Sequence, residues 1–189
     1  MSWRLNLFKI FWLRSAIICF LLLMPSQVWS QDQDTSIHQA TIHGDVEKLQ
    51  ALLADGVDIG LKYGQGNSAI HFASWHGNVQ IIELLLNKGG DINAQNKWGE
   101  TPLNLAVFFN HEKTVSLLIA KGADVSIKGE EGATPLHRAA YSGHIAVAEI
   151  LIRNGADAGS KDNMGKTPLD YAKQQGRKKM ISLFKNNSR

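Results

Sequence analysis

The chain has 189 residues, of which 44% are hydrophobic, so it is long enough to bury a substantial core. It carries 20 basic and 17 acidic side chains, but three of the basic ones (Arg4, Lys9 and Arg14) lie in the first 30 residues. The remainder is formally neutral, which excludes a chain-wide basic surface for nucleic acid or anionic lipid. The single cysteine, Cys19, lies in the same segment, so the rest of the chain cannot form an internal disulfide.

The first 30 residues have the order of features found in a secretory signal peptide. Basic residues precede the apolar run SAIICFLLLM at 15–24, and Val28 and Ser30 stand before a predicted cleavage site ahead of Gln31. The run is shorter than the ~20 apolar residues that span a bilayer. We therefore predict a signal peptide at 1–30, a short tail at 31–34, and no stable membrane insertion after cleavage. An uncleaved anchor that also uses residues 11–13 is the alternative.

From residue 35 onward the sequence repeats with a period of 33 residues. One column holds a hydroxyl residue, namely Thr35, Ser68, Thr101, Thr134 and Thr167. A second column holds Asp58, Asp91, Asp124 and Asp157, and a third holds Gly44, Gly77, Asn110, Gly143 and Gly176. Columns that share one register predict about five units, starting near 35, 68, 101, 134 and 167, in a repeat domain over 35–189.

Each unit is predicted to contain two short helices followed by a projecting loop. In the third unit Thr101 is an expected N-cap, Pro102 stands at the first helical position, and Asn110 is an expected left-handed terminator. A second helix is indicated by apolar residues such as those at 81–86, and a Gly- and Asn-rich stretch then predicts a hairpin-like finger. Neither helix can bury its apolar face alone, so the units must stack.

This pattern resembles the ankyrin repeat over about Thr35 to Lys185. The signature Thr-Pro-Leu-His-x-Ala is intact only at Thr134–Ala139, and the other units read TSIHQA, SAIHFA, TPLNLA and TPLDYA. The resemblance implies an all-α ankyrin-repeat solenoid of about five 33-residue helix-turn-helix units, with the first and last units as caps. Combined with the leader, the chain is similar to the exported, periplasmic ankyrin-repeat proteins of Gram-negative bacteria.

The sequence favours neither a catalytic nor a metal site. All seven histidines occupy repeat columns, and the resemblance implies that the histidine after Thr-Pro-Leu makes structural hydrogen bonds, whereas zinc needs three or four converging ligands. No Gly-x-Ser-x-Gly, His-Glu-x-x-His or nucleotide-binding motif occurs. We expect no enzyme, no cofactor and no metal; a metal or small-molecule binder that uses the histidines, and an enzyme with a cryptic site, are the rivals. Arg177-Lys178-Lys179 is interpreted as a solvated cap, so no nucleic acid partner is expected.

One further column is unusual, because it places a large ring just before the Gly/Asn column in three consecutive units. Its members Trp75, Phe108 and Tyr141 are called the aromatic strip below. The resemblance places this column on the concave groove between helices and fingers. Rings buried between helices are the alternative, but a row of exposed rings on one surface is typical of a binding site. Of the adjacent pair Phe108 and Phe109, we expect one to line the groove and the other to wedge against its neighbour.

The aromatic strip and its neighbours form the predicted partner-binding site. Its candidate residues are Tyr63, Trp75, His76, Trp98, Phe108, Phe109, Tyr141 and Ser142. The predicted function is a monomeric, non-enzymatic periplasmic module that binds a protein partner on its concave, aromatic-lined face. The resemblance allows an accessory role in oxidative-stress (catalase) defence, and the alternative is an inhibitor or immunity protein that neutralises a periplasmic or secreted enzyme.

Overall fold

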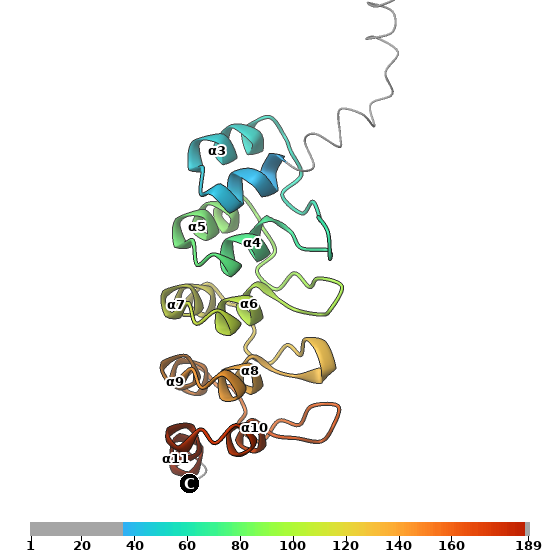
Figure 1. The fold of residues 1–189 in the computed structure, drawn as a ribbon. Coiled ribbons are helices and arrows are strands. Elements are labelled where there is room, and N and C mark those ends of the chain that lie inside the picture. Colours follow the sequence, from blue (N-terminus) through green and yellow to red (C-terminus); the bar gives the residue numbers. More distant parts are fainter. Residues whose placement is uncertain (1–35, 188–189) are drawn as a thin grey trace, which may run out of the picture.

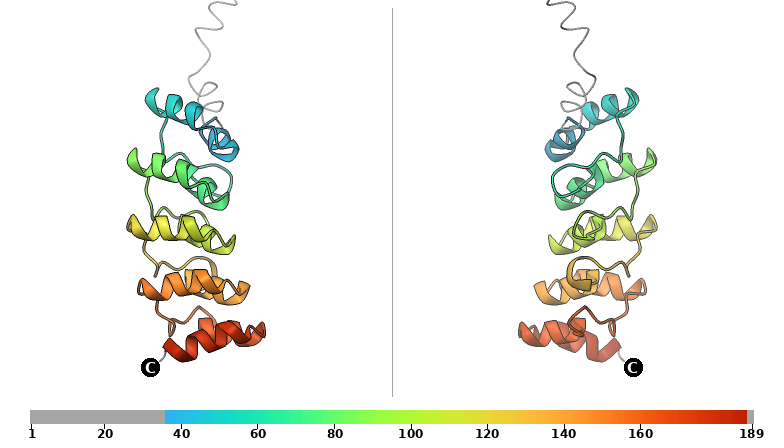
Figure 2. Two further views of the ribbon diagram at one scale, coloured as in Figure 1. Left: turned by 90° about the vertical axis from the view of Figure 1, so that its left-hand side faces the viewer. Right: turned by 90° about the vertical axis from the view of Figure 1, so that its right-hand side faces the viewer.

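Five helix pairs stack in chain order in the computed structural model, which describes residues 36–187 (Figures 1 and 2). The first helices of units 1 to 5 are residues 36–43, α4 (Ala69–Trp75), α6 (Pro102–Phe108), α8 (Pro135–Ser142) and α10 (Pro168–Gln174). The second helices are α3 (Val46–Ala54), α5 (Val79–Asn87), α7 (Glu112–Ala120), α9 (Ile145–Arg153) and α11 (Lys178–Asn187). The predicted all-α repeat solenoid is confirmed.

The helix boundaries follow from local capping chemistry. The Thr101 hydroxyl accepts the amide of Asn104 at 3.3 Å, and proline occupies the first turn of α6, α8 and α10. Behind each first helix the chain turns through a left-handed residue: four glycines, and Asn110 with φ of 60° in unit 3. Asparagine tolerates this conformation better than most non-glycine residues, so the turn is the same in every unit.

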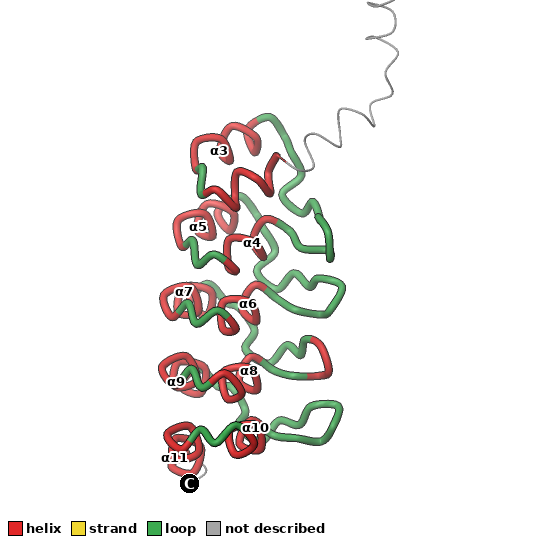
Figure 3. The backbone as a smooth tube through the Cα atoms, viewed as in Figure 1, coloured by secondary structure: helices red, strands yellow, loops and turns green. Residues whose placement is uncertain are grey.

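The molecule has three layers, with the second helices on one side, the first helices in the middle and the loops on the other side (Figure 1). We call the loops fingers 1 to 4, at residues 58–67, 91–100, 124–133 and 157–166. Finger 3 contains a short 3-10 turn, η1 (Glu130–Gly132), which is the red segment among the green loops in Figure 3. The surface made by the first helices and the fingers is called the finger-side face; it corresponds to the predicted concave face.

The core runs the length of the stack between the helix layers. Leu103 and Leu136 of the first helices and Leu85, Leu118 and Leu151 of the second helices are fully buried. Burying one such side chain contributes about 1.5–3 kcal/mol, and every unit relies on its neighbours to complete that burial. At the C-terminal end, α11 buries Met180 and Phe184 while Lys178 and Lys179 stay exposed, as a cap requires.

The predicted signal peptide at 1–30 and the tail at 31–34 lie outside the described residues. Within residues 36–187, none of the helices combines the length and the apolar character that crossing a membrane would require. The longest second helices span about ten residues, and each has a polar outer side opposite the side that packs in the core.

Histidines tie the end of a finger to the first helix of the same unit, next to the start of the following unit. His71 Nδ1 accepts from the backbone amide and the hydroxyl of Ser68, and its Nε2–H donates to the Glu100 carbonyl of the next finger at 3.1 Å. His137 repeats the arrangement with Thr134 and the Lys166 carbonyl. The structural role that the resemblance implies for these two histidines is therefore present in the fold.

Unit 3 breaks this pattern because Asn104 replaces the histidine. Its Oδ1 accepts from the Thr101 hydroxyl at 2.9 Å, but its buried Nδ2 has no hydrogen-bond partner. The amide side chain is shorter than imidazole and does not reach the next finger. A buried N–H without a partner is destabilising, so this position weakens the attachment of finger 3 to the first helix of its unit.

Replacing Asn104 by His should therefore stabilise the protein. We expect the free energy of unfolding to rise by about 1 kcal/mol, because the imidazole Nε2–H can reach the Ala133 carbonyl as its equivalents reach theirs in units 2 and 4. Urea denaturation followed by circular dichroism measures the change. A loss of stability would mean that the ring does not fit beside Gly129, where an added Cβ atom would lie 2.8 Å from Asn104 Nδ2.

Candidate functional site

The aromatic strip is exposed on the last turns of the first helices. Trp75, Phe108 and Tyr141 have 41%, 46% and 50% of their surface exposed. The alternative of rings sealed between helices is therefore wrong for this column. Several large exposed rings at equivalent positions of consecutive units mark this surface as a candidate interaction site.

The backbone of each strip residue is held by the next unit. His111 Nε2 donates to the Trp75 carbonyl at 2.8 Å and His144 Nε2 donates to the Phe108 carbonyl at 3.2 Å. Arg177 Nε donates to the Tyr141 carbonyl at 3.4 Å. These carbonyls end their helices and would otherwise lack a hydrogen-bond partner within the protein. The same bonds that join the units therefore also fix the backbone from which each ring projects.

Phe109 bridges units 2 and 3 on the surface. Its ring stacks on Trp75 with centroids 4.9 Å apart and meets Phe108 edge-on at 5.0 Å. It does contact its neighbours, as expected, but 36% of its surface stays exposed, so it does not thicken the core. Together Trp75, Phe108 and Phe109 form a three-ring cluster that spans the boundary between two units.

A pocket separates this cluster from Tyr141. Tyr141 meets Tyr171 of α10 at 6.2 Å with the ring planes 76° apart, and Tyr171 meets His137 at 5.9 Å. The pocket has a volume of about 340 Å³. Its walls come from finger 3 and three first helices, and its lining residues are Phe108, Glu130, Glu131, Ala133, His137, Arg138, Tyr141, Ser142 and Tyr171. We call it the finger-3 pocket.

Sequence reasoning missed Arg138 and Tyr171. Both stand four residues after the cap of their unit, where Phe72 and Leu105 stand in units 2 and 3. All four are half-buried. The signal was available, because this position lies three residues before the strip and residues at i and i+3 share one helix face.

The remaining predicted residues lie at other places on the surface. The ring of Tyr63 lies 5.6 Å from that of His38 at finger 1, and Trp98 is exposed on finger 2, where its amide donates to Asn96 Oδ1. Among the described residues neither ring contacts the aromatic strip.

His76 is exposed at the end of α4, whereas Ser142 lines the finger-3 pocket. The structure thus brings Phe108, Tyr141 and Ser142 together around the pocket, and Phe108 also belongs to the three-ring cluster with Trp75 and Phe109.

Finger 3, which forms one wall of the pocket, lacks the side chain that holds the turns of fingers 2 and 4. In finger 2 Asn96 Oδ1 accepts the amides of Trp98 and Glu100, and in finger 4 Asp162 accepts the two equivalent amides. Gly129 occupies this position in finger 3 and offers no acceptor. The turn must therefore be held by another residue.

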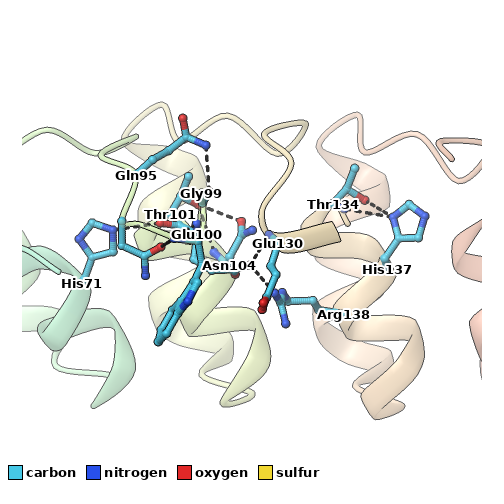
Figure 4. Close-up of polar contacts among 12 residues, drawn as sticks. His71, Gln95, Gly99, Glu100, Thr101, Asn104, Glu130, Thr134, His137 and Arg138 are labelled. Carbon is cyan, nitrogen blue, oxygen red and sulfur yellow. Dashed lines mark hydrogen bonds and ion pairs between the residues drawn. The ribbon is translucent and has the colours of Figure 1, made fainter. Parts of the chain in front are cut away.

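Glu100 of the preceding finger takes over this task (Figure 4). Its carboxylate accepts the Glu130 amide at 2.9 Å and forms an ion pair with Arg138, and only 4% of Glu100 is exposed. A Cβ atom on Gly129 would collide with Glu100 Oε1, so the glycine makes room for this carboxylate. Charge-assisted bonds from Glu100 of unit 2 to Glu130 of unit 3 and Arg138 of unit 4 thus fix the wall of the pocket.

The protonation states of the pocket residues follow from their surroundings. The Tyr171 hydroxyl donates to Asp162 at 2.6 Å, and this hydrogen bond, with burial, raises the pKa of Tyr171 to about 12. Desolvation opposes ionisation of Asp162, but hydrogen bonds from Tyr171 and two backbone amides lower its pKa. Burial lowers the pKa of His137. The pocket is therefore lined at neutral pH by a neutral phenol and a neutral imidazole.

Within residues 36–187 there is no cluster of three or more His, Cys, Asp or Glu side chains arranged to hold a metal ion. The arrangement of the finger-3 pocket is that of a recognition surface: rings, one neutralised guanidinium and two carboxylates on a finger. The rings offer apolar contact area, and the two carboxylates can interact with a charged group.

The sequence matches a family model described as Ankyrin repeats (3 copies) in four overlapping segments, at residues 14–96, 37–129, 85–162 and 126–188. No curated protein sequence matches the chain. The family match covers most of the chain, and the observed helix pairs, left-handed turns and fingers fit a repeat of this kind. The chain therefore belongs to the ankyrin-repeat family.

Proposed function

We propose that this protein is a non-enzymatic binding module that holds a protein partner on its finger-side face. Ankyrin repeats are a protein–protein interaction fold, which supports the general class of function. The observation that carries the proposal is the exposure of Trp75, Phe108 and Tyr141 on a single face. Large rings with few rotatable bonds bury much area at a small entropy cost, which makes them frequent binding hot spots.

The rigidity of the face favours the same function. Each strip residue has its backbone carbonyl bound by the following unit, and Phe109 is stacked on Trp75. Rings that are already ordered lose little freedom when a partner binds, so more of the contact energy appears as affinity. Recognition would work through shape complementarity to a preformed surface, without a cofactor.

We further propose that the protein acts in the periplasm after export through residues 1–30, as an accessory factor in catalase-dependent defence against peroxide. The order of basic residues, apolar run and small residues in the leader supports export. Inhibition of a toxic periplasmic enzyme is the other function compatible with a preformed binding face. The identity of the bound partner separates the two roles.

Replacing Trp75 and Tyr141 together by Ala is expected to abolish capture of the partner from a periplasmic extract. Each ring is half-exposed, so its loss should leave the helical content nearly unchanged while weakening binding by about 2 kcal/mol per ring. Wild type and variant are compared as bait, and the affinity of the recovered partner is then measured by calorimetry.

A variant with Gln80→Ala and Ser116→Ala is the matched control, because both side chains are exposed on the second helices, away from the finger-side face. It should capture the partner as wild type does. Equal losses of thermal stability and of binding in the Trp75 and Tyr141 variant would mean that those rings stabilise the fold, and this result would contradict the proposal.

A further inference from the structure

We infer that the finger-3 pocket receives a lysine or arginine side chain of the protein partner. This inference rests on the proposed binding function and adds the chemistry of one contact. It follows from the aromatic walls of the pocket, from the carboxylates at its edge and from the ion pair that Arg138 already forms with Glu100.

The walls are aromatic on two sides. Tyr141 and Tyr171 lie nearly perpendicular to each other and form a corner, and Phe108 lines the opposite part of the pocket. The faces of such rings carry a negative quadrupole, which attracts an ammonium or guanidinium group within about 6 Å. A long basic side chain can also place its methylene groups against the rings.

The protein itself places a cation over one of these rings. Lys166 Nζ lies 5.5 Å from the centre of the Tyr171 ring. The same ring donates its hydroxyl proton to Asp162, so negative charge stands at its edge. The surroundings of Tyr171 thus stabilise positive charge, and the aromatic corner continues from this ring to the exposed Tyr141.

The edge of the pocket carries negative charge that is not neutralised by an ion pair. Glu130 and Glu131 both line the pocket from finger 3 and are exposed. In the part of the chain that the structure describes, neither carboxylate forms an ion pair. Of the nearby basic residues, Arg138 pairs with Glu100, while Lys128 Nζ donates to the Lys161 carbonyl and Lys166 Nζ donates to Gln174, so none of the three pairs with Glu130 or Glu131. An incoming cation would therefore meet two carboxylates.

This charge distribution separates the possible occupants. An acidic side chain would be repelled by Glu130 and Glu131, and the charge of Arg138 is already paired with that of Glu100, which leaves the buried Arg138 Nε without a hydrogen-bond partner among the described residues. An apolar side chain would use the rings but would leave both carboxylates without a counter-charge. A basic side chain uses both features, and this complementarity favours lysine or arginine.

The test uses blocked five-residue peptides of glycine whose central residue is lysine, arginine, norleucine or glutamate. Binding to the ¹⁵N-labelled full chain is followed by NMR titration of the amides around Phe108, Tyr141 and Tyr171. We expect the two basic peptides to bind about fivefold more tightly than the norleucine peptide, and the glutamate peptide to bind most weakly. The preference should decrease as salt is added.

A variant with Glu130→Gln and Glu131→Gln should lose this preference, while a control with Glu83→Gln and Glu112→Gln, which removes the same charge from exposed positions on the second helices, should keep it. Equal or tighter binding of norleucine in wild type would overturn the inference and identify an apolar pocket. An unchanged preference in the Glu130 and Glu131 variant would overturn it as well. If the captured partner depends on Trp75 and Tyr141 but is insensitive to Glu130 and Glu131, the proposed function stands and this inference fails.

Discussion

Replacing Glu100 by Ala should lower the free energy of unfolding by about 3 kcal/mol, although Glu100 lies on a loop. The substitution leaves Arg138 half-buried without its counter-charge and leaves the Glu130 amide without an acceptor. Removing one member of a buried pair is costly because the other charge stays desolvated, and the partial exposure of Arg138 places the loss at the lower end of the usual range. Urea denaturation measures the loss, and amide hydrogen exchange at Glu130 should become faster.

The control for this prediction uses Gly129, the position whose missing acceptor is replaced by the Glu100 carboxylate. In wild type, Gly129→Asn should destabilise the protein because its Cβ would collide with Glu100 Oε1 and would also lie 2.8 Å from Asn104 Nδ2. In the Glu100→Ala background only the second of these contacts remains, and it is with the end of a side chain. In the Glu100→Ala background the same substitution should recover about 1 kcal/mol of the free energy of unfolding. The new asparagine could accept backbone amides of finger 3, as Asn96 accepts two backbone amides of finger 2. A change of sign between the two backgrounds supports the exchange of roles, and equal effects in both would contradict it.

The repeat architecture was predictable because its signals are local. Thr101 and Pro102 begin a helix, and Asn110 can replace glycine in the left-handed turn, whatever lies further along the chain. A fixed period then places equivalent residues on one face, which is why the exposure of Trp75 and Tyr141 could also be expected. Their role in binding stays a prediction.

The pocket was less predictable, because it depends on contacts between units. Glu100 and Arg138 are 38 residues apart, so one period does not relate them, and their pairing needs the space left by Gly129. The sequence shows that Gly129 stands where fingers 2 and 4 have Asn96 and Asp162, but it does not show which residue compensates for the missing acceptor. Where a repeat column is interrupted, the period does not predict which contact replaces the usual one, and only the structure shows it.

The second large effect expected is a loss of stability in mild acid that originates at His71. This imidazole is fully buried, and burial lowers its pKa from 6.5 to about 4. Between these values the unfolded chain binds a proton that the folded protein does not bind, so the free energy of unfolding falls as the pH falls. The contribution is fully present above pH 6.5, and about 3 kcal/mol of it should be lost by pH 4.

A His71→Asn variant isolates this contribution, because Asn104 already occupies the equivalent position in unit 3 and keeps the bond to its cap residue. We expect the variant to be less stable than wild type at pH 7 and to lose less stability between pH 6.5 and 4. His137 responds in the same direction in both proteins, and the lowered pKa values of Asp162 and Asp170 act below this window, so the difference between the curves belongs to His71. Parallel stability curves would contradict the assignment, since they would require His71 to be protonated equally in the folded and unfolded chains.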